Sequence, residues 1–404
     1  MYDILEGVRV VEVSMFAFGP SAAAVLGEWG ADVVKVVHPA FGDPMRAQAI
    51  ANLPSREDDL SFMWEILNRN KRCIAVDLST DAGRSILDDL LVDADVFLTN
   101  FLPDSREKLR IDVDDVRAVN DRIIYARASG QGVRGPEAEK GGFDHTSYWC
   151  RSGIAHSAAQ VGVEFIPQVG PAFGDLASGF ALASGVAGAL YRRERTGRPA
   201  VVDVSLLGMG VWMFGPAIVA SELYDVDTIP RQRHQDLPNP LVAAYETSDG
   251  RQIYIAGVRT DGDWLNFCTT IERPDLADDP RFADGPARLA NRVECISKLD
   301  EVFAARSLDE WRELLDGLTT PWTVVQTAHE AFHDPQVSAN GYVVPVTAQG
   351  RTAMKLVASP VQFDEQPAEV TPAPEHGEHT EQILLERGHA WDDIAAWKEQ
   401  KVII

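Results

Sequence analysis

The sequence predicts an α/β fold, with an open, mostly parallel, Rossmann-like sheet in a large domain and a second, smaller α+β domain. Val-rich segments alternate with Ala- and Leu-rich segments through the first third of the chain, which is typical of strand–helix–strand units. After residue 225 this alternation gives way to prolines and mixed charges. The 404 residues also exceed the length that one hydrophobic core usually serves.

The large domain is predicted from its first strand–helix–strand unit onward. Residues 8–13 and 33–37 are Val-rich strands, and residues 21–29 form a helix that ends at Gly30. A connection of this kind joins parallel strands. The same alternation predicts further strands at 73–76, 96–98, 123–126 and 201–204, and further helices at 81–91, 114–119, 173–195 and 206–223. Open sheets of this type bind ligands at the carboxyl ends of their strands.

The second half of the chain has a different composition. Residues 226–240 hold three prolines and are predicted to form a linker. We expect the small α+β domain over residues 226–328, with a hairpin at 245–256 and helices at 262–270, 288–303 and 308–316. The proline-rich residues 366–378 are predicted to be extended, and a short helix at 380–387 is predicted to be the last element.

Charge and composition limit the partners of the protein. The net charge of −24 argues against nucleic acid and anionic membranes, because both would be repelled. Residues 1–6 lack the basic and apolar regions of a signal peptide, and no apolar run is expected to reach the roughly 18 residues that cross a bilayer. We therefore expect a cytoplasmic protein. The four cysteines are far apart along the chain and are expected to be reduced thiols without a metal.

Two motifs bear on ligand binding. The first strand-to-helix turn, residues 14–20, lacks the G-x-G-x-x-G pattern of dinucleotide sites, which argues against an NAD- or FAD-dependent oxidoreductase. Residues 68–72, Asn-Arg-Asn-Lys-Arg, are the densest basic cluster of this acidic chain. They form either a solvated surface or, because they precede a strand of the parallel sheet, a phosphate contact.

A carboxylate stands at the start of the helix predicted at 173–195. Asp175 follows Gly174 there, and an Asp at the start of a helix is most often an N-cap. His376, Glu378 and His379 lie close together, but their proline-rich setting argues against a metal site. Taken alone, neither motif assigns a function.

An ordered set of short motifs runs almost from end to end of the chain. It comprises Leu5–Val10, Gly19-Pro20, Leu26–Val36, Gly42–Pro44, Asn68–Arg72, Val76–Leu78, Asn100–Pro103, Ser129–Gly132, Gly142–Asp144, Gly174-Asp175, Arg195–Arg198, Val202–Ser205, Tyr245–Gly250, Asp279–Phe282, Ser359–Val361 and Gly377–Thr380. In this order the motifs resemble the class III CoA-transferases of the CaiB/BaiF type, the family of formyl-CoA and carnitine CoA-transferases and of α-methylacyl-CoA racemases.

The resemblance implies an architecture. In this family the N- and C-terminal segments join in one large α/β domain, so residues 329–404 would complete the domain that residues 1–225 begin. Two chains would pass through one another as interlocked rings and form a homodimer. The proline-rich segments at 226–240 and 366–378 would suit the crossings.

The resemblance also implies an activity, acyl-CoA:carboxylate CoA transfer, with Asp175 matching the catalytic nucleophile of the family. The implied partners are an acyl-CoA, a free carboxylic acid and a second copy of the chain. No cofactor is expected beyond coenzyme A itself as a substrate. Each transfer would proceed through an aspartyl anhydride and an aspartyl-CoA thioester.

Further site residues follow from the same comparison. The expected CoA contacts are Phe16, Ala17, His38, Val76, Asn100, Phe101 and Lys108, together with Arg72 from the basic cluster. The expected acyl pocket comprises Met15, Phe143, Asp144 and His145. Met15 and Ala17 stand where the formyl enzyme has a His and a Gln, which indicates an acyl pocket that is apolar. Val37, His38 and Leu102 depart from the charged residues common in the family, which leaves phosphate binding open.

Two alternatives remain at this point. A racemase of the same family would need an acid and a base on either side of the α-carbon. Racemases place a His directly before the Asp of the Gly-x-Asp motif, but Phe143 stands there in this chain, so only His145 or Asp144 could substitute. The other alternative is a catalytically idle CoA-binding protein, against which the intact Asp175 argues.

Overall fold

The computed structural model describes residues 2–47, 60–159, 169–230, 232–257, 260–346 and 353–404. These residues form two compact units. The first combines the chain up to Thr228 with the segment Pro335–Ile404, and the second is Ile229–Asp334. The two boundaries fall close to residues 226 and 329, where the small domain is expected to begin and the return segment to start.

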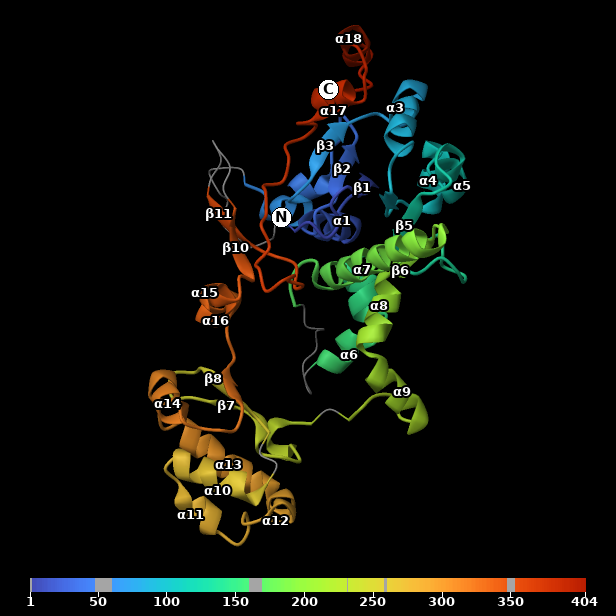
Figure 1. Cartoon of the computed structure of the whole chain (residues 1–404). Helices are drawn as coiled ribbons and strands as arrows, with labels where there is room; N and C mark the ends of the chain where they lie inside the picture. Colours follow the sequence, from blue (N-terminus) through green and yellow to red (C-terminus); the bar gives the residue numbers. More distant parts are fainter. Residues whose placement is uncertain (1, 48–59, 160–168, 231, 258–259, 347–352) are drawn as a thin grey trace. The chain divides into compact units, whose positions relative to one another are not determined.

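The first unit is built on a six-stranded sheet in which each strand pairs with its neighbours in parallel. The strand order is β3-β2-β1-β4-β5-β6. The strands are β1 (Arg9–Val13), β2 (Asp32–Val37), β3 (Arg72–Ala75), β4 (Val96–Thr99), β5 (Ile124–Ser129) and β6 (Val201–Ser205). The predicted parallel sheet is therefore confirmed, with strand ends shifted by at most three residues (Figure 1).

The strand order places a crevice next to β1. From β1 the chain moves outward to β2 and β3, and it then returns to the other side of β1 as β4. Val10 is paired with Val33 on one side and with Val96 on the other. Where the direction of winding reverses, the connections after the two strands diverge and leave space for a ligand at their carboxyl ends.

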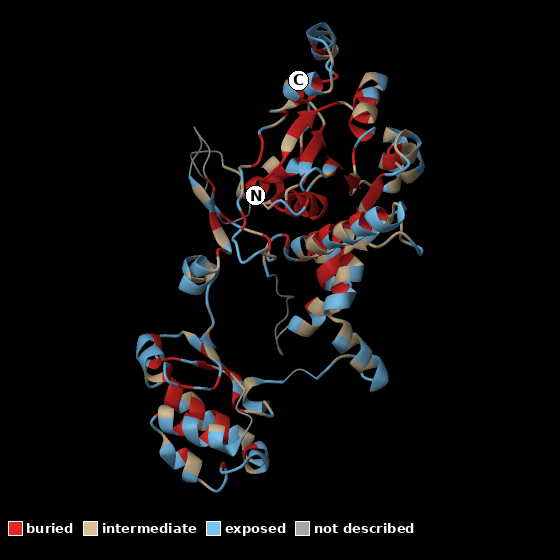
Figure 2. Ribbon diagram, in the orientation of Figure 1, coloured by how far each residue is buried: buried red, intermediate tan, exposed pale blue. Residues whose placement is uncertain are grey.

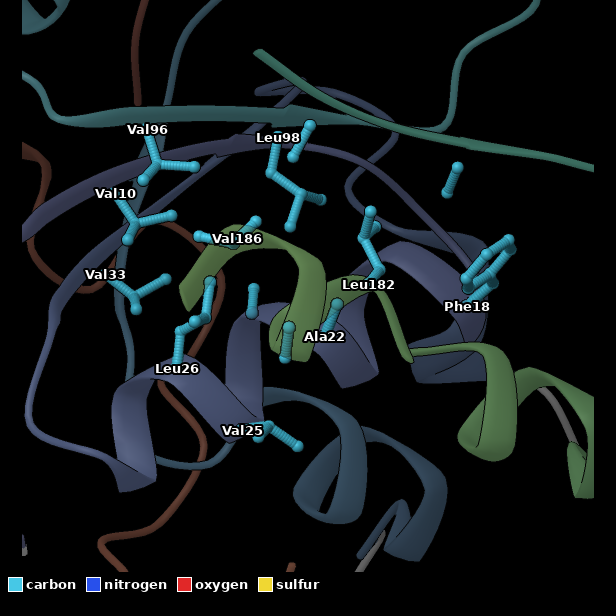
Figure 3. Close-up of a cluster of buried hydrophobic side chains, with 14 of the residues drawn as sticks. Val10, Phe18, Ala22, Val25, Leu26, Val33, Val96, Leu98, Leu182 and Val186 are labelled. Carbon is cyan, nitrogen blue, oxygen red and sulfur yellow. The ribbon is translucent and has the colours of Figure 1, made fainter. Parts of the chain in front are cut away.

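Helices cover both faces of this sheet. On one face, α1 (Phe18–Glu28) and α7 (Phe173–Thr196) pack against the strand residues Val10, Val33 and Leu98 (Figure 3). On the other face, α3 (Asp81–Leu91) and α5 (Val113–Val119) share a core with α17 (Thr380–Glu386) and α18 (Trp391–Glu399). Strands β1 to β5 are buried along most of their length, as Figure 2 shows in red, whereas β6 at the edge of the sheet has no buried residue. The C-terminal segment thus completes the first unit.

Helix α7 lies unusually close to α1. A Cβ atom built on Gly179 would lie 1.9 Å from Ser21 Oγ and 3.0 Å from both the Ala22 nitrogen and the Phe18 carbonyl oxygen. By its length and composition alone, α7 could cross a membrane. This differs from the expectation that no apolar segment of the chain is long enough to do so. Leu182 and other side chains of α7 are fully buried in the core of the first unit, which accounts for this apolar composition.

The second unit is a small α+β domain, as predicted. Its antiparallel sheet has the order β7-β8-β9, and a core around Trp264, Phe267 and Trp311 joins sheet and helices. Its elements are β7 (Val242–Glu246), β8 (Gln252–Ala256), α10 (Asp261–Thr270), α11 (Pro274–Asp278), α12 (Gly285–Ala290), α13 (Arg292–Phe303), α14 (Leu308–Leu315) and β9 (Trp322–Val324).

Several predicted elements differ from the structure. The single helix expected at 206–223 is two helices, α8 (Leu206–Met213) and α9 (Gly215–Leu223), which meet at an angle of 67°. Pro216 in the first turn of α9 explains the break, because proline cannot continue the hydrogen bonding of α8. The helix expected at 288–303 is likewise divided, at Asn291, and α18 rather than α17 is the last helix.

Short elements without a strong periodic pattern were not predicted. They are α2 (Phe62–Asn68), α4 (Pro103–Leu109), the π-helical turn η2 (Asp144–Cys150), α6 (Ile154–Ala158), the short 3₁₀ turns η1 (Pro44–Ala47) and η3 (His234–Asp236), α15 (Ala328–His333), α16 (Pro335–Ala339), β10 (Val343–Val346) and β11 (Met354–Val357), besides α11 and β9 of the second unit.

The packing of α1 on α7 predicts different effects for two glycines of the same helix. Gly179→Ala should lower the free energy of unfolding by about 1–3 kcal/mol, because the added methyl group meets backbone atoms of α1. Gly188→Ala is the matched control, since an added Cβ would meet nothing within 4 Å; it should be neutral or stabilise by up to ~1 kcal/mol. Urea denaturation measures both, and equal effects would contradict this account of the packing.

Candidate functional site

The turn after β1 is fixed by a side chain from the neighbouring strand. Asn100, which follows β4, donates from Nδ2 to the Met15 carbonyl at 2.6 Å and accepts from the Met15 N–H at 3.1 Å. These two bonds satisfy both backbone groups of Met15. The side chain of Asn100 therefore joins the carboxyl ends of β1 and β4 where the sheet reverses its winding direction.

Phe16, the next residue, has an uncommon backbone conformation. Its φ of 64° lies in the left-handed region, which costs about 1–2 kcal/mol for a residue with a Cβ atom. The Phe16 N–H donates to Asp43 Oδ1 at 3.1 Å, which holds the turn in place. The Phe16 ring meets the Phe143 ring edge to face, with centroids 5.8 Å apart. The chain thus fixes this aromatic side chain at the opening of the crevice.

A buried network of charges lies beneath the turn. Lys35 Nζ is 2.9 Å from Glu12 Oε1 and 3.0 Å from Asp43 Oδ2, and Lys71 Nζ is 2.7 Å from Glu12 Oε2. Lys35 also donates to the Ser14 carbonyl at 2.9 Å. We call Glu12, Lys35, Asp43 and Lys71 the buried charge network; fully ionised, it carries no net charge.

The network shifts the pKa values of its members in different directions. Burial opposes ionisation of Glu12, but Lys35 and Lys71 outweigh it and lower the pKa of Glu12 to about 2. Burial lowers the pKa of Lys71 to about 7, although Glu12 opposes this change. Glu12 and Lys35 therefore stay ionised near neutral pH, and Lys35 keeps its hold on the turn through the Ser14 carbonyl.

The first turn of α7 lies at the same crevice. Its N-cap is Ala172, with φ of 58°, so Asp175 is not the N-cap that its position in the sequence predicted. Asp144 instead accepts a hydrogen bond at Oδ1 from the Gly174 N–H at 2.9 Å. A Cβ atom on Gly174 would lie 2.4 Å from that oxygen and 2.2 Å from Tyr148 Cγ, so only glycine fits here.

Asp175 has a strongly perturbed carboxyl group. Burial raises its pKa from 3.8 to about 7, and the carboxylate of Asp144 adds to the shift. Burial also raises the pKa of Asp144, against the opposing effects of the Gly174 N–H and of the charge of His145. A carboxylate that is poorly solvated and ionises near neutral pH is suited to act as a nucleophile or a general base.

These features meet in one cavity of about 650 Å³ in the first unit. The residues expected at the site that line it are Met15, Phe16, Ala17, Asn100, Phe101, Phe143 and Asp175. Further lining residues that were not predicted are Leu102, Arg106, Arg127, Ser129, Lys140 and Leu206. The structure thus brings together the turn after β1, the end of β4 and the first turn of α7.

Other expected site residues lie outside the lining of this cavity. Asp144 is buried behind Gly174, and the partly buried His145 follows it in η2. His38 stacks on Phe41, and its Nε2 lies 3.8 Å from Asp77 Oδ1, close to where Val76 is buried at the end of β3. Lys108 is exposed on α4. Their contacts with CoA stay predictions.

The basic cluster at 68–72 does not line this cavity. Lys71 belongs to the buried charge network, and Arg69 pairs with the buried Glu28. Arg72 begins β3, at the opposite end of the strands from the cavity, and it pairs with Asp32 at 2.7 Å and Glu386 at 2.6 Å. The structure therefore does not bring Arg72 to the cavity, because its charge joins β2 to α17.

One signal for the buried charge network was present in the sequence. Glu12 and Lys35 interrupt two Val-rich strands of a sheet that is buried on both faces, and a charged residue there requires a partner.

No candidate metal site is found in the part of the chain that the structure describes. The described residues contain no group of three or more His, Cys, Asp or Glu side chains that could hold a metal ion.

The chain is similar to known proteins along almost its whole length. A family model described as CoA-transferase family III matches residues 5–380. An (R)-2-hydroxy-4-methylpentanoate CoA-transferase of Clostridioides difficile is 33% identical, with 99% of each chain covered. A succinate–glutarate CoA-transferase of Agrobacterium fabrum is 30% identical over 95% of each chain. The crystal structure of a CAIB/BAIF family protein from Brucella suis has a TM-score of 0.83 and 28% identity, covering 95% of this chain and 99% of the other.

The raised pKa of Asp175 predicts a pH-dependent effect on stability. The folded protein disfavours the ionised carboxylate, so the contribution of Asp175 to stability should fall as the pH rises from about 4 to about 7. Asp175→Asn removes this charge and should raise the melting temperature at pH 8 but not at pH 4. Asp121→Asn, at an exposed position, serves as the control, and it should change the melting temperature by the same amount at pH 8 and at pH 4. A melting-temperature difference for Asp175→Asn that is the same at both pH values would contradict the raised pKa.

Proposed function

This chain belongs to CoA-transferase family III, and from that premise we propose that it moves CoA from an acyl-CoA to a free carboxylate through covalent intermediates on Asp175. The observation that carries the proposal is the environment of Asp175. Its carboxyl group is partly buried with a raised pKa, lies in the first turn of α7 and shares a cavity with the turn that Asn100 fixes. The names of relatives that cover almost the whole chain support the same reaction class.

In the first half of the proposed reaction, the ionised Asp175 attacks the thioester carbonyl carbon of the acyl-CoA. The C–S bond breaks, CoA leaves as a thiolate, and an anhydride joins Asp175 to the acyl group. The thiolate then attacks the aspartyl carbonyl of this anhydride. The acyl group leaves as a free carboxylate, and Asp175 carries CoA as a thioester.

The second half reverses these steps with the acceptor acid. Its carboxylate attacks the aspartyl thioester, the thiolate leaves, and a second anhydride forms. Attack of the thiolate on the acceptor carbonyl gives the new acyl-CoA and restores the Asp175 carboxylate. Each step exchanges acyl groups of similar reactivity, so the scheme needs no cofactor beyond CoA. Asp144 assists by raising the pKa of Asp175, because a more basic carboxylate is a stronger nucleophile.

We further propose that the protein works as a homodimer in which two chains interlock. Helix α9 has no buried residue among those that the structure describes. Trp212 on α8 and Leu223 and Tyr224 at the end of α9 are each exposed by three quarters or more. Soluble proteins rarely leave large apolar side chains gathered in this way without a partner, and a second copy of the chain would cover them.

Transfer activity tests the proposed role of Asp175. Asp175→Asn should reduce CoA transfer more than about a hundredfold, because the amide cannot form the anhydride. Asp144→Asn should keep part of the activity, since an amide oxygen can still accept the Gly174 N–H bond. Chromatography of acyl-CoA products measures both. If Asp175→Asn retained more than a few per cent of the wild-type turnover, this residue would be excluded as the nucleophile.

An assay on the same purified protein distinguishes a transferase from a racemase. The Phe143 ring at the cavity has no proton to donate, so the wild-type protein should not exchange the α-proton of a 2-methylacyl-CoA in deuterated water. Deuterium incorporation that disappears in His145→Ala would instead favour the racemase. A protein that binds CoA but neither transfers nor exchanges would be catalytically idle.

The dimer proposal predicts a mass that does not change on dilution. Light scattering at micromolar concentration should give about twice the mass of one chain, because interlocked chains cannot separate without unfolding. The double variant with Trp212→Ser and Tyr224→Ser should form a dimer that is less stable than the wild-type dimer. A monomeric mass for the active wild-type protein is the result that the proposal does not allow.

A further inference from the structure

The cavity wall near Asp175 presents two aromatic rings. Phe16 and Phe143 line the same cavity as Asp175, and Met15 and Leu206 add further apolar surface. Phe143 is exposed by 62% and Phe16 by 36%, so both rings leave apolar surface uncovered in the absence of a ligand. We call these two rings the aromatic pair. An acyl chain that covered them would gain roughly 25 cal/mol per Å² of apolar surface removed from water.

The conformation of Phe16 indicates that its ring has a function. A glycine would adopt the left-handed φ of 64° without strain, yet the chain carries a Phe there. The position is held by Asp43, which accepts the Phe16 N–H bond and is itself paired with Lys35. Strain of this kind persists where the surroundings impose it, and it clusters at functional sites.

The charges around the cavity disfavour a substrate with a second carboxylate. The basic side chains among the described lining residues each have a carboxylate partner already: Arg106 with Asp112 at 2.9 Å, Arg127 with Asp203 at 2.7 Å, and Lys140 with Glu137 at 2.8 Å. The charge that acts on Asp175 is the carboxylate of Asp144, which repels anions.

We propose that the acyl substrates of this site are apolar monocarboxylic acids and that the aromatic pair selects them. This inference rests on the proposed CoA-transferase function. An apolar acyl chain covers the two rings, whereas the far carboxylate of a dicarboxylic acid would lose water without gaining a free cation. Phe16 and Phe143 are thus specificity-determining residues of the reaction at Asp175.

Exchange of a labelled acid into its own CoA thioester tests the proposal without knowledge of the natural acceptor. The full-length protein is given 4-methylpentanoyl-CoA with ¹³C-labelled 4-methylpentanoate or, separately, glutaryl-CoA with ¹³C-labelled glutarate. Acetyl-CoA with labelled acetate is the short reference. We expect kcat/KM for the branched acid to exceed that for glutarate at least about tenfold. The selectivity is the ratio of kcat/KM for 4-methylpentanoate to that for acetate.

Two variants test the aromatic pair itself. Phe143→Ala should lower this selectivity about tenfold, mainly through KM. Phe16→Gly should lower it as well while leaving the melting temperature unchanged or higher, because glycine relieves the backbone strain. Phe41→Ala is the matched control, since Phe41 is 82% exposed and lies outside the cavity lining, and it should leave the ratio unchanged.

The outcomes distinguish this inference from the proposed function. No exchange with any of the three acids would overturn the transferase itself. Exchange that favours glutarate, or that keeps its selectivity in both Phe143→Ala and Phe16→Gly, would overturn the apolar specificity and leave the transferase intact. A lower melting temperature in Phe16→Gly with unchanged selectivity would show that the ring serves folding alone.

Discussion

The close approach of helices α1 and α7 decides where the reactive carboxylate lies. Gly179 allows the two backbones to come so near that Ser21 Oγ contacts α7, donating to the Asp175 carbonyl at 3.4 Å. Because α1 begins at the turn after β1 and α7 begins at Phe173, this packing places the first turns of both helices at one crevice. The sheet supplies the crevice and the helix pair supplies Asp175 to it.

The buried charge network supports the other side of the cavity. It joins β1, β2 and the residue before β3 to the loop that carries Asp43, and Asp43 holds the strained Phe16. A buried network of this kind adds little to stability compared with an apolar core, but removal of one partner leaves an uncompensated charge and costs about 3–5 kcal/mol. Its contribution is a single, fixed geometry of the turn, on which both the position of the thioester and the choice of acyl group would depend.

Much of this arrangement could be predicted from the sequence, and the failures have physical causes. Val-rich strands alternating with helices predicted the parallel sheet, and the family resemblance predicted seven of the residues that line the cavity. Arg72 was misplaced because its partners Asp32 and Glu386 are distant in sequence, so its charge looked free. For the same reason nothing identified Asp144 as the partner of the α7 N-terminus. The break at Pro216 was visible, but the apolar composition on both sides of it obscured the boundary.

The central claim is that Asp175 carries CoA during transfer, and mass spectrometry of the quenched protein tests it most directly. The protein is mixed with an acyl-CoA, quenched in acid and digested. The account predicts that the peptide containing Asp175 gains the mass of CoA less one water, as a thioester that hydroxylamine removes, and that Asp175→Asn gains nothing. A transferring enzyme that shows no such adduct under these conditions, or that carries CoA on a different residue, would contradict the account.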